Sequence, residues 1–419
     1  MDGNDGPNNA RETEPQPPQG RFHRLGMGLC FGGALMLVLV GVMGLLLTCC
    51  RPRRRRVGLP PEFASPSLDG ALRVRVRLLS GAKEASLTTF GPFDWTSPGS
   101  GWSRRGHAGT HLVTVAGGGL LIDGQSVPHR TVVARVPQAL FDLNERLYRG
   151  ALIFSVGADG DLIATEELPL EDYVRGVVPS EVPALWPRDA VMAQAVAART
   201  FALHRSLSTT GRSWISRLDL AYRGVDGESW RSDRAVRDTL GTVLEWNGRP
   251  LPAFFHSTCG GHTTSAQSVF GGLDIPPLAG VPCRWDEDSP HYAWKTSMTL
   301  SDLADSLKSR GISALRSIRE GDRDPSGRLE YVIVNGRKRI PAADFRMEVD
   351  ARAIKSTDFS ITRSGDTVEF TGHGWGHGVG LCQWGAHGMA EEGHSWREIL
   401  SHYYPGAKLR QVDELQQMR

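Results

Sequence analysis

Residues 168–204, LPLEDYVRGVVPSEVPALWPRDAVMAQAVAARTFALH, contain the strongest structural signal in the chain. Pro187 suits the first turn of a helix because its missing N–H would be unpaired there, and Asp189 favours the positive end of the helix dipole. From Ala190 onward, small and apolar residues recur at helical spacing around most of the helix circumference. The stretch therefore predicts a buried helix at about 187–205.

A carboxylate, Glu181, precedes this helix in a short turn bounded by prolines. The apolar run from Tyr173 to Val178 predicts a strand before the turn. Gln194 and Arg199 are polar exceptions within the buried helix. Because a buried guanidinium needs a partner, we expect Arg199 to pair with Glu181. On spacing alone, a structural ion pair and a catalytic acid explain this glutamate equally well.

The composition is that of a globular protein, with 419 residues of which 40% are hydrophobic and 22% charged. The net charge of +2 at pH 7 gives no indication of a nucleic-acid partner, and we expect none. Short apolar runs separated by Gly, Asp and Pro predict a β-rich segment at 70–168 that begins with a half-buried strand from Leu72. Within this segment, Phe90–Trp102 predicts a long loop. The expected fold is α+β, a β-rich scaffold of short, mostly antiparallel strands around the buried helix.

The amino-terminal part has a different character. Residues 1–24 form a polar tail rich in Gly, Pro and Asn, which we expect to be disordered. Residues 25–50 carry no charged side chain and exceed the roughly 20 residues needed to cross a bilayer. We therefore expect an uncleaved transmembrane helix there, followed at 51–69 by a basic juxtamembrane segment and linker. The rest divides into one large domain at 70–410 and a tail at 411–419.

Four separated motifs are more specific than any of these patterns. They are LEDYVRGVVPSEVP (170–183), AQAVAARTFAL (193–203), FHSTCGGHT (255–263), and GHGWGHGVGLCQWGAHGMAEEG followed by ILSHYYPGA (372–407). With these motifs, the chain resembles the family of stage II sporulation protein D, which includes the amidase enhancer proteins. The resemblance covers the whole predicted domain at 70–410.

The resemblance implies that Glu181 is the catalytic acid of a peptidoglycan lytic transglycosylase. A carboxyl group can protonate the glycosidic oxygen and then accept the proton of the sugar's own C6 hydroxyl as a 1,6-anhydro ring closes. Apolar neighbours such as Val178, Val182 and Trp186 would raise the pKa of Glu181 for this role. Met192 stands where family members often carry a basic residue, which leaves the substrate preference open.

The glycine-rich run GHGWGHGVG (372–380) allows the backbone to lie close to a ligand or to other backbone. Its imidazoles and exposed amides suit a sugar-binding wall, and a tightly packed loop beneath the site is an equal alternative. We expect substrate contacts from Arg199, Gln194, His373, His377 and Gln383.

A second group of potential ligands is His256, Cys259 and His262. Histidine and cysteine suit Zn²⁺, and some relatives of the family are understood to bind zinc near this motif. A disulfide between Cys259 and Cys283 is the competing possibility, and it excludes metal binding by the Cys259 thiolate. A structural zinc ion, a disulfide, and unpaired core or loop residues all remain open, and the chemistry expected of Glu181 requires no cofactor.

Together with the resemblance, these features imply a membrane-anchored enzyme whose catalytic domain faces the periplasm or cell wall. It would cut peptidoglycan glycan strands already stripped of stem peptides, in cell-wall remodelling or sporulation, with a peptidoglycan amidase as partner. The alternative is a non-catalytic, wall-binding activator of such an amidase. Arginines at 51–56 favour a cytoplasmic domain by the positive-inside rule, but an arginine cluster also binds anionic headgroups, and we expect the outer location.

Overall fold

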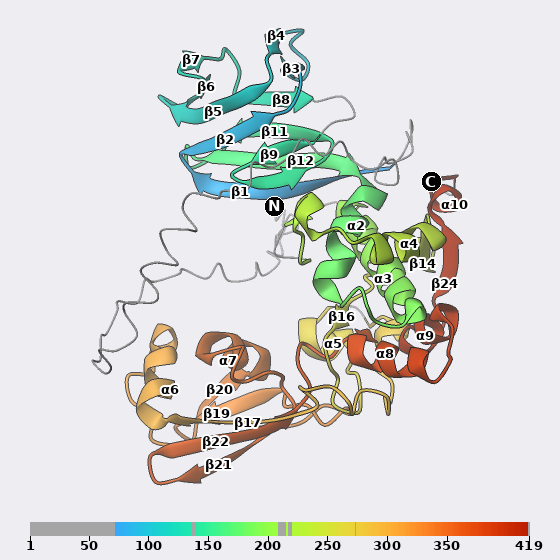
Figure 1. Ribbon diagram of the computed structural model, residues 1–419. Helices are drawn as coiled ribbons and strands as arrows, with labels where there is room; N and C mark the ends of the chain where they lie inside the picture. The colour runs from blue at the N-terminus through green and yellow to red at the C-terminus, as the bar shows by residue number, and fades with distance from the viewer. Residues whose placement is uncertain (1–71, 136–139, 208–214, 217–219, 273, 418–419) are drawn as a thin grey trace, which may run out of the picture. The chain divides into compact units, whose positions relative to one another are not determined.

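The computed structural model describes residues 72–135, 140–207, 215–216, 220–272 and 274–417 (Figure 1). The expected tail, transmembrane helix and juxtamembrane linker at 1–69 lie outside these residues. No helix in the described ranges is both long enough and apolar enough to cross a bilayer.

Residues 73–169 form most of two sheets, which are antiparallel except where β13 pairs in parallel with β1. The strand orders are β13-β1-β12-β11-β8-β3-β4 and β10-β9-β2-β5-β6-β7. The strands are β1 (Arg73–Ala82), β2 (Glu84–Thr89), β3 (Phe93–Thr96), β4 (Ser103–Gly106), β5 (Gly109–Ala116), β6 (Gly119–Ile122), β7 (Gln125–Ser126), β8 (Thr131–Arg135), β9 (Phe141–Leu143), β10 (Arg146–Tyr148), β11 (Ala151–Val156), β12 (Leu162–Pro169) and β13 (Ile215–Ser216).

The predicted half-buried first strand is confirmed. In β1, Val74 and Val76 are buried whereas the neighbouring Arg73 and Arg75 are exposed. The long loop expected at 90–102 is wrong, because β3 lies inside it and pairs with β4 and β8. Phe93 and Trp95 of β3 are buried in the larger core, which explains why this segment forms a strand and not a loop.

Three helices follow, α2 (Leu170–Glu181), α3 (Arg188–Leu207) and α4 (Trp230–Asp238). The strand predicted at Tyr173–Val178 is wrong, because these residues lie in α2. Its buried residues include Tyr173, Val174, Val177 and Val178, whose i, i+1, i+4, i+5 spacing places them on one helix face. A short apolar run does not distinguish a buried strand from a buried helix.

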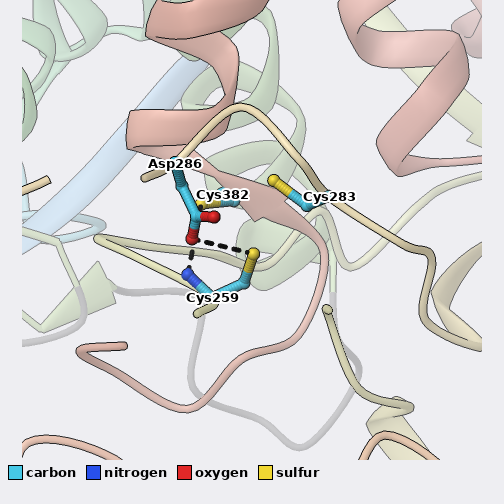
Figure 2. Close-up of side chains that lie close together, drawn as sticks. All are labelled: Cys259, Cys283, Asp286 and Cys382. Carbon is cyan, nitrogen blue, oxygen red and sulfur yellow. Dashed lines mark hydrogen bonds between the residues drawn. The ribbon is translucent and has the colours of Figure 1, made fainter. Parts of the chain in front are cut away.

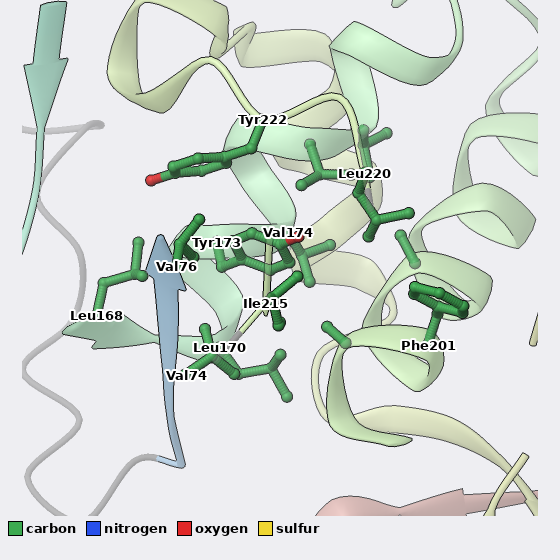
Figure 3. Close-up of a cluster of buried hydrophobic side chains, with 14 of the residues drawn as sticks. Val74, Val76, Leu168, Leu170, Tyr173, Val174, Phe201, Ile215, Leu220 and Tyr222 are labelled. Carbon is green, nitrogen blue, oxygen red and sulfur yellow. The ribbon is translucent and has the colours of Figure 1, made fainter. Parts of the chain in front are cut away.

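The buried helix predicted at 187–205 is confirmed as α3, in which every residue from Ala190 to Leu203 is buried. It packs against α2, α4, β14, α8 and α9. Figure 3 shows Val74 and Val76 of β1 beside Leu170 and Tyr173 of α2, in the same hydrophobic core that contains α3.

The remaining residues form smaller sheets with the orders β15-β14-β24, β16-β23, β17-β22-β21 and β18-β19-β20, of which only the β16-β23 pair is parallel. The strands are β14 (Thr242–Trp246), β15 (Arg249–Pro250), β16 (Phe255–His256), β17 (Ala293–Thr299), β18 (Ile318–Glu320), β19 (Tyr331–Val334), β20 (Lys338–Pro341), β21 (Phe359–Ser364), β22 (Thr367–His373), β23 (Leu381–Cys382) and β24 (Lys408–Gln411). The helices are α5 (Ala266–Phe270), α6 (Leu300–Ser306), α7 (Ala342–Val349), α8 (Gln383–Glu391), α9 (Trp396–Tyr403) and α10 (Val412–Gln417), with 3-10 turns at Gly224–Gly227, Pro276–Leu278 and Lys308–Arg310.

Two large hydrophobic cores organise these elements, and a third, small cluster packs α10 against Leu203 and Val243. The larger core joins the β-rich segment, α2, α3, α8 and α9, and a separate core built from residues between Trp294 and Phe370 lies beneath β17, β19 and β22. The expected mixed α+β fold with mostly antiparallel strands is therefore confirmed for the described residues. The segment expected to be a tail beyond 410 contains α10, which buries Val412 and Leu415.

The guanidinium of Arg199 holds α3 against the start of α2. Its Nε and Nη2 each donate a hydrogen bond of 2.8 Å to the Glu171 carboxylate, and it also donates to the backbone carbonyls of Val236 and Thr242. The Arg199 side chain has 0% exposure. The expected pairing with Glu181 is therefore wrong. Because Arg199 is sealed from solvent, it is a structural residue and not a substrate contact.

Arg199→Met should lower the free energy of unfolding by roughly 3–5 kcal/mol, because it leaves the Glu171 carboxylate without its buried partner. Urea unfolding followed by tryptophan fluorescence would measure the loss. The matched control is Arg188→Met, which removes the exposed pair with Asp238 and should leave the unfolding free energy close to that of the wild type. Equal stability of both variants would contradict a structural role for Arg199.

Candidate active site

Glu181 is the last residue of α2 and is half-buried. The backbone N–H of Ala221 donates a 2.7 Å hydrogen bond to its Oε1, and the Gln383 side chain forms a second hydrogen bond to the carboxylate. The site thus combines the end of α2, the segment before the 3-10 turn at Gly224–Gly227, and the first residue of α8. Two donors from distant parts of the chain fix the direction of the carboxyl group.

Burial raises the pKa of Glu181 above its ordinary value of 4.5, and the hydrogen bonds from Ala221 and Gln383 oppose that shift. Removal from water disfavours the ionised form of a carboxyl group. The two donors stabilise the carboxylate once it forms. Such a group can give up a proton and later take one back, as general acid and then base catalysis requires.

Gln383, which hydrogen-bonds this carboxylate, also contacts the amide of Gln194. Gln383 Nε2 is 3.5 Å from Gln194 Oε1, and both residues are buried. Gln194 Nε2 has no hydrogen-bond partner among the described residues. Both glutamines were predicted as substrate contacts. The structure brings Gln383 to Glu181, whereas Gln194 contacts Gln383 and orients it.

An aromatic cluster is formed by Trp186, from the segment between α2 and α3, and by Trp384 and His387 of α8. The ring centroids are 5.1 Å apart for Trp186 and Trp384, 4.8 Å for Trp186 and His387, and 5.4 Å for Trp384 and His387. All three side chains are half-buried. From the sequence, Trp186 is expected only as an apolar neighbour of Glu181, and neither Trp384 nor His387 is predicted as a site residue. Their i, i+3 spacing at the start of α8, directly after Gln383, is the signal that could have revealed them.

The two histidines predicted for substrate binding have different surroundings. His373 is exposed, with its Nδ1 3.6 Å from Asp358 Oδ2. His377 packs against Phe254, Phe270 and His256, and burial lowers its pKa to about 4. Neither imidazole hydrogen-bonds Glu181 in the ranges that the structure describes. His377 therefore matches the packed-loop alternative, whereas His373 remains available to a ligand.

The predicted metal ligands do not come together. His256 Nδ1 bonds to the Val379 carbonyl oxygen, and His262 Nδ1 to the Thr263 carbonyl oxygen. Cys259 lies instead with Cys283, Asp286 and Cys382, all buried, and the four potential ligand atoms are within 4.8 Å of one another (Figure 2). We call this group the thiol cluster. The two histidines of the expected set are thus replaced by Cys283, Asp286 and Cys382.

The cysteines of the thiol cluster carry free thiols, so the alternative Cys259–Cys283 disulfide is not formed in the structure. Hydrogen bonds from the other two thiols lower the pKa of Cys283, whereas burial raises the pKa of Cys259 and of Cys382.

Comparison with known proteins shows the family of the chain. The family model described as stage II sporulation protein matches residues 158–246, which contain Glu181 and Gln194, and a domain of unknown function matches residues 284–380. The chain is 33% identical to stage II sporulation protein D of Bacillus subtilis over 270 residues, which cover 60% of this chain and 77% of that protein. It therefore belongs to the stage II sporulation protein D family.

Two further relatives show how broad the similarity is. An uncharacterized protein of Brachyspira hyodysenteriae is 34% identical over 275 residues, covering 64% of this chain and 74% of that protein. The amidase enhancer of Bacillus subtilis is 27% identical over 291 residues, covering 56% of this chain and 40% of that protein. The resemblance identified from the four motifs is confirmed.

The raised pKa predicts a distinctive pH dependence for Glu181→Gln. The folded state prefers protonated Glu181, so the wild type and the variant should be equally stable below pH 4.5. As the pH rises through the raised pKa of Glu181, the wild type should become less stable than the variant. Thermal unfolding at about pH 4 and about pH 8 would measure the change. Glu84→Gln, at an exposed position of β2, is the control and should show no such difference. A pH-independent effect of Glu181→Gln would contradict the raised pKa.

Proposed function

We propose that this protein is a lytic transglycosylase that cleaves the glycan strands of peptidoglycan, with Glu181 as its acid and base. The observation that carries the proposal is the half-buried Glu181 carboxyl, whose pKa is raised by burial and whose direction is fixed by Ala221 and Gln383. The family also supports a role at the cell wall, because the relatives include a stage II sporulation protein D and an amidase enhancer.

In the proposed reaction, protonated Glu181 donates its proton to the oxygen of the scissile glycosidic bond. The bond from C1 to that oxygen breaks, and positive charge develops on the sugar ring. The Glu181 carboxylate, stabilised by the Ala221 N–H and the Gln383 amide, then accepts the proton of the C6 hydroxyl. The C6 oxygen forms the new bond to C1, which closes a 1,6-anhydro ring and restores the acid.

The surroundings of Glu181 support a nucleophile supplied by the substrate. Glycosidases that add water use a second carboxylate roughly 5–10 Å away, as nucleophile or as base. In the part of the chain that the structure describes, no neighbouring carboxylate contributes to the pKa of Glu181. An isolated carboxyl group suits an internal attack by the sugar better than hydrolysis.

The aromatic cluster supports a sugar as the substrate. Half-buried rings present apolar faces on which a pyranose can stack, while a neighbouring polar edge binds hydroxyl groups. Trp384 belongs to the same helix as Gln383, the residue that hydrogen-bonds Glu181, and we propose that its ring is part of the sugar-binding surface. We propose glycan already stripped of stem peptides as the preferred form, cut during wall remodelling or sporulation by a domain that faces the wall and is anchored through residues 25–50.

The second candidate function is activation of a peptidoglycan amidase without catalysis. It is favoured by the 27% identity to a protein named amidase enhancer. The two functions differ in their products, because only a transglycosylase leaves 1,6-anhydro ends when it is incubated alone with glycan strands. A wild type that is inert alone but accelerates an amidase would favour the activator.

Glu181→Gln should reduce the formation of 1,6-anhydro ends by roughly 10²- to 10⁴-fold, because the amide cannot donate the required proton. Mass spectrometry of denuded glycan strands after incubation with the purified protein would measure the products. Glu84→Gln is the control, since this exposed glutamate lies in β2 and should leave the rate unchanged. If Glu181→Gln formed 1,6-anhydro ends as fast as the wild type, the role of Glu181 as the acid would be refuted. Products with ordinary reducing ends would indicate a hydrolase.

Trp384→Ala should raise KM for glycan strands roughly tenfold, equivalent to about 1.4 kcal/mol, because a stacking surface is lost. Steady-state kinetics over a range of strand concentrations would separate KM from kcat. Trp384→Phe keeps an aromatic face and should have a smaller effect, and Phe90→Ala removes an exposed aromatic ring elsewhere and should have none. An unchanged KM in Trp384→Ala would remove the aromatic cluster from the binding surface.

A further inference from the structure

The thiol cluster brings together three separate parts of the chain. Cys259 follows β16, Cys283 and Asp286 lie between the 3-10 turn at Pro276–Leu278 and β17, and Cys382 ends β23. Figure 2 shows the three sulfur atoms and the carboxylate converging on one interior point. We propose that these four residues hold one Zn²⁺ ion in a tetrahedral structural centre.

The distances suit a tetrahedral ion. With Zn–S bonds of about 2.3 Å, tetrahedral ligand atoms lie roughly 3.8 Å apart. Asp286 Oδ2 is 3.1 Å from Cys259 Sγ and 3.6 Å from Cys382 Sγ, and all four ligand atoms lie within 4.8 Å of one another. An ion at their centre therefore requires only small movements of side chains.

Backbone N–H groups are directed at two of the potential ligand atoms. The backbone N–H groups of Cys259 and Gly385 both donate to Cys382 Sγ, at 3.2 and 3.3 Å, and Gly260 N–H donates to Asp286 Oδ2 at 2.7 Å. A thiol sulfur is a weak acceptor, so two N–H donors directed at Cys382 Sγ would be better matched once a metal ion holds that sulfur as a thiolate. Hydrogen bonds of this kind orient and tune metal ligands.

One atom of the cluster is unexplained without an ion. Asp286 has 0% exposure, and its Oδ1 has no hydrogen-bond partner among the described residues. A buried, unsatisfied carboxylate oxygen is costly. Coordination of Zn²⁺ by Asp286 would neutralise the charge of this carboxylate, and coordination through Oδ1 would also give the unsatisfied oxygen its partner.

A disulfide explains the cluster less well. It would consume two sulfurs and leave the third thiol and the carboxylate buried without a function. Three sulfurs and one oxygen exclude magnesium and calcium, which prefer oxygen ligands, and a closed tetrahedral set without an open position is typical of structural zinc.

The proposed ion would stabilise the base of the active site without taking part in the chemistry. Cys382 is followed directly by Gln383, which hydrogen-bonds Glu181. The Cys259 carbonyl accepts a 2.6 Å hydrogen bond from the buried Arg328, which belongs to the segment with its own hydrophobic core. The ion would therefore connect this segment to the start of α8. The inference is independent of the proposed transglycosylase activity.

Elemental analysis by plasma mass spectrometry of the full-length protein, purified without chelator, would test the centre. We expect about one zinc ion per chain. Cys382→Ser and Asp286→Asn should lose most of the zinc, whereas His262→Ala should retain it, because His262 bonds to Thr263 and lies outside the cluster.

If the ligand variants fail to fold, the proposal can still be tested on the wild-type protein by titrating its thiols. A mercurial reagent that modifies the thiols should release zinc in proportion to the thiols blocked, as measured with a colorimetric zinc indicator. Cobalt substitution should produce the absorption bands of tetrahedral thiolate-bound Co²⁺. Three reduced thiols without metal, a Cys259–Cys283 disulfide in the purified protein, or loss of zinc in His262→Ala would each overturn the proposal.

Discussion

The bidentate ion pair between Arg199 and Glu171 is the constraint on which the rest of the structure depends. The pair joins two helices that are both largely buried, and it leaves no charge of α3 unpaired at the centre of the larger core. A buried charge is tolerated only where its partner is positioned accurately. The pair therefore determines how α2 lies on α3, and with it the position of every residue in α2.

This constraint also places the active site. Glu171 and Glu181 lie at opposite ends of α2, roughly 15 Å apart at 1.5 Å rise per residue, so one guanidinium cannot serve both. Because Arg199 neutralises Glu171, Glu181 has no cationic partner among the described residues that would lower its pKa. Its neighbours are neutral donors, Ala221 and Gln383. A carboxyl group near apolar side chains and away from arginine is suited to hold a proton.

Residues at the start of α8 contribute both to the proposed active site and to the proposed zinc site. Gln383 contacts the carboxyl, Trp384 and His387 contribute to the aromatic cluster, and Cys382 belongs to the thiol cluster. These residues lie beyond both matched family models, which end at 246 and 380. One short segment thus provides a hydrogen bond to Glu181, two rings of the proposed sugar-binding surface and a ligand for the proposed ion. Its small residues allow α8 to approach the core closely, since a Cβ at Gly388 would lie 2.3 Å from the Trp285 carbonyl oxygen.

The sequence by itself determined those features that depend on local periodicity and on motifs. These include the buried helix α3, the alternating strand β1, the family, and Glu181 as the candidate acid. Tertiary structure decided which side chains meet. The partner of Arg199 depends on the packing of two helices, and Cys259 and Cys382 are 123 positions apart along the chain. Local patterns record whether a residue will be buried, because burial repeats with the turn of a helix or strand. They carry no information on which distant residue fills the same space, because that is determined only when the elements pack.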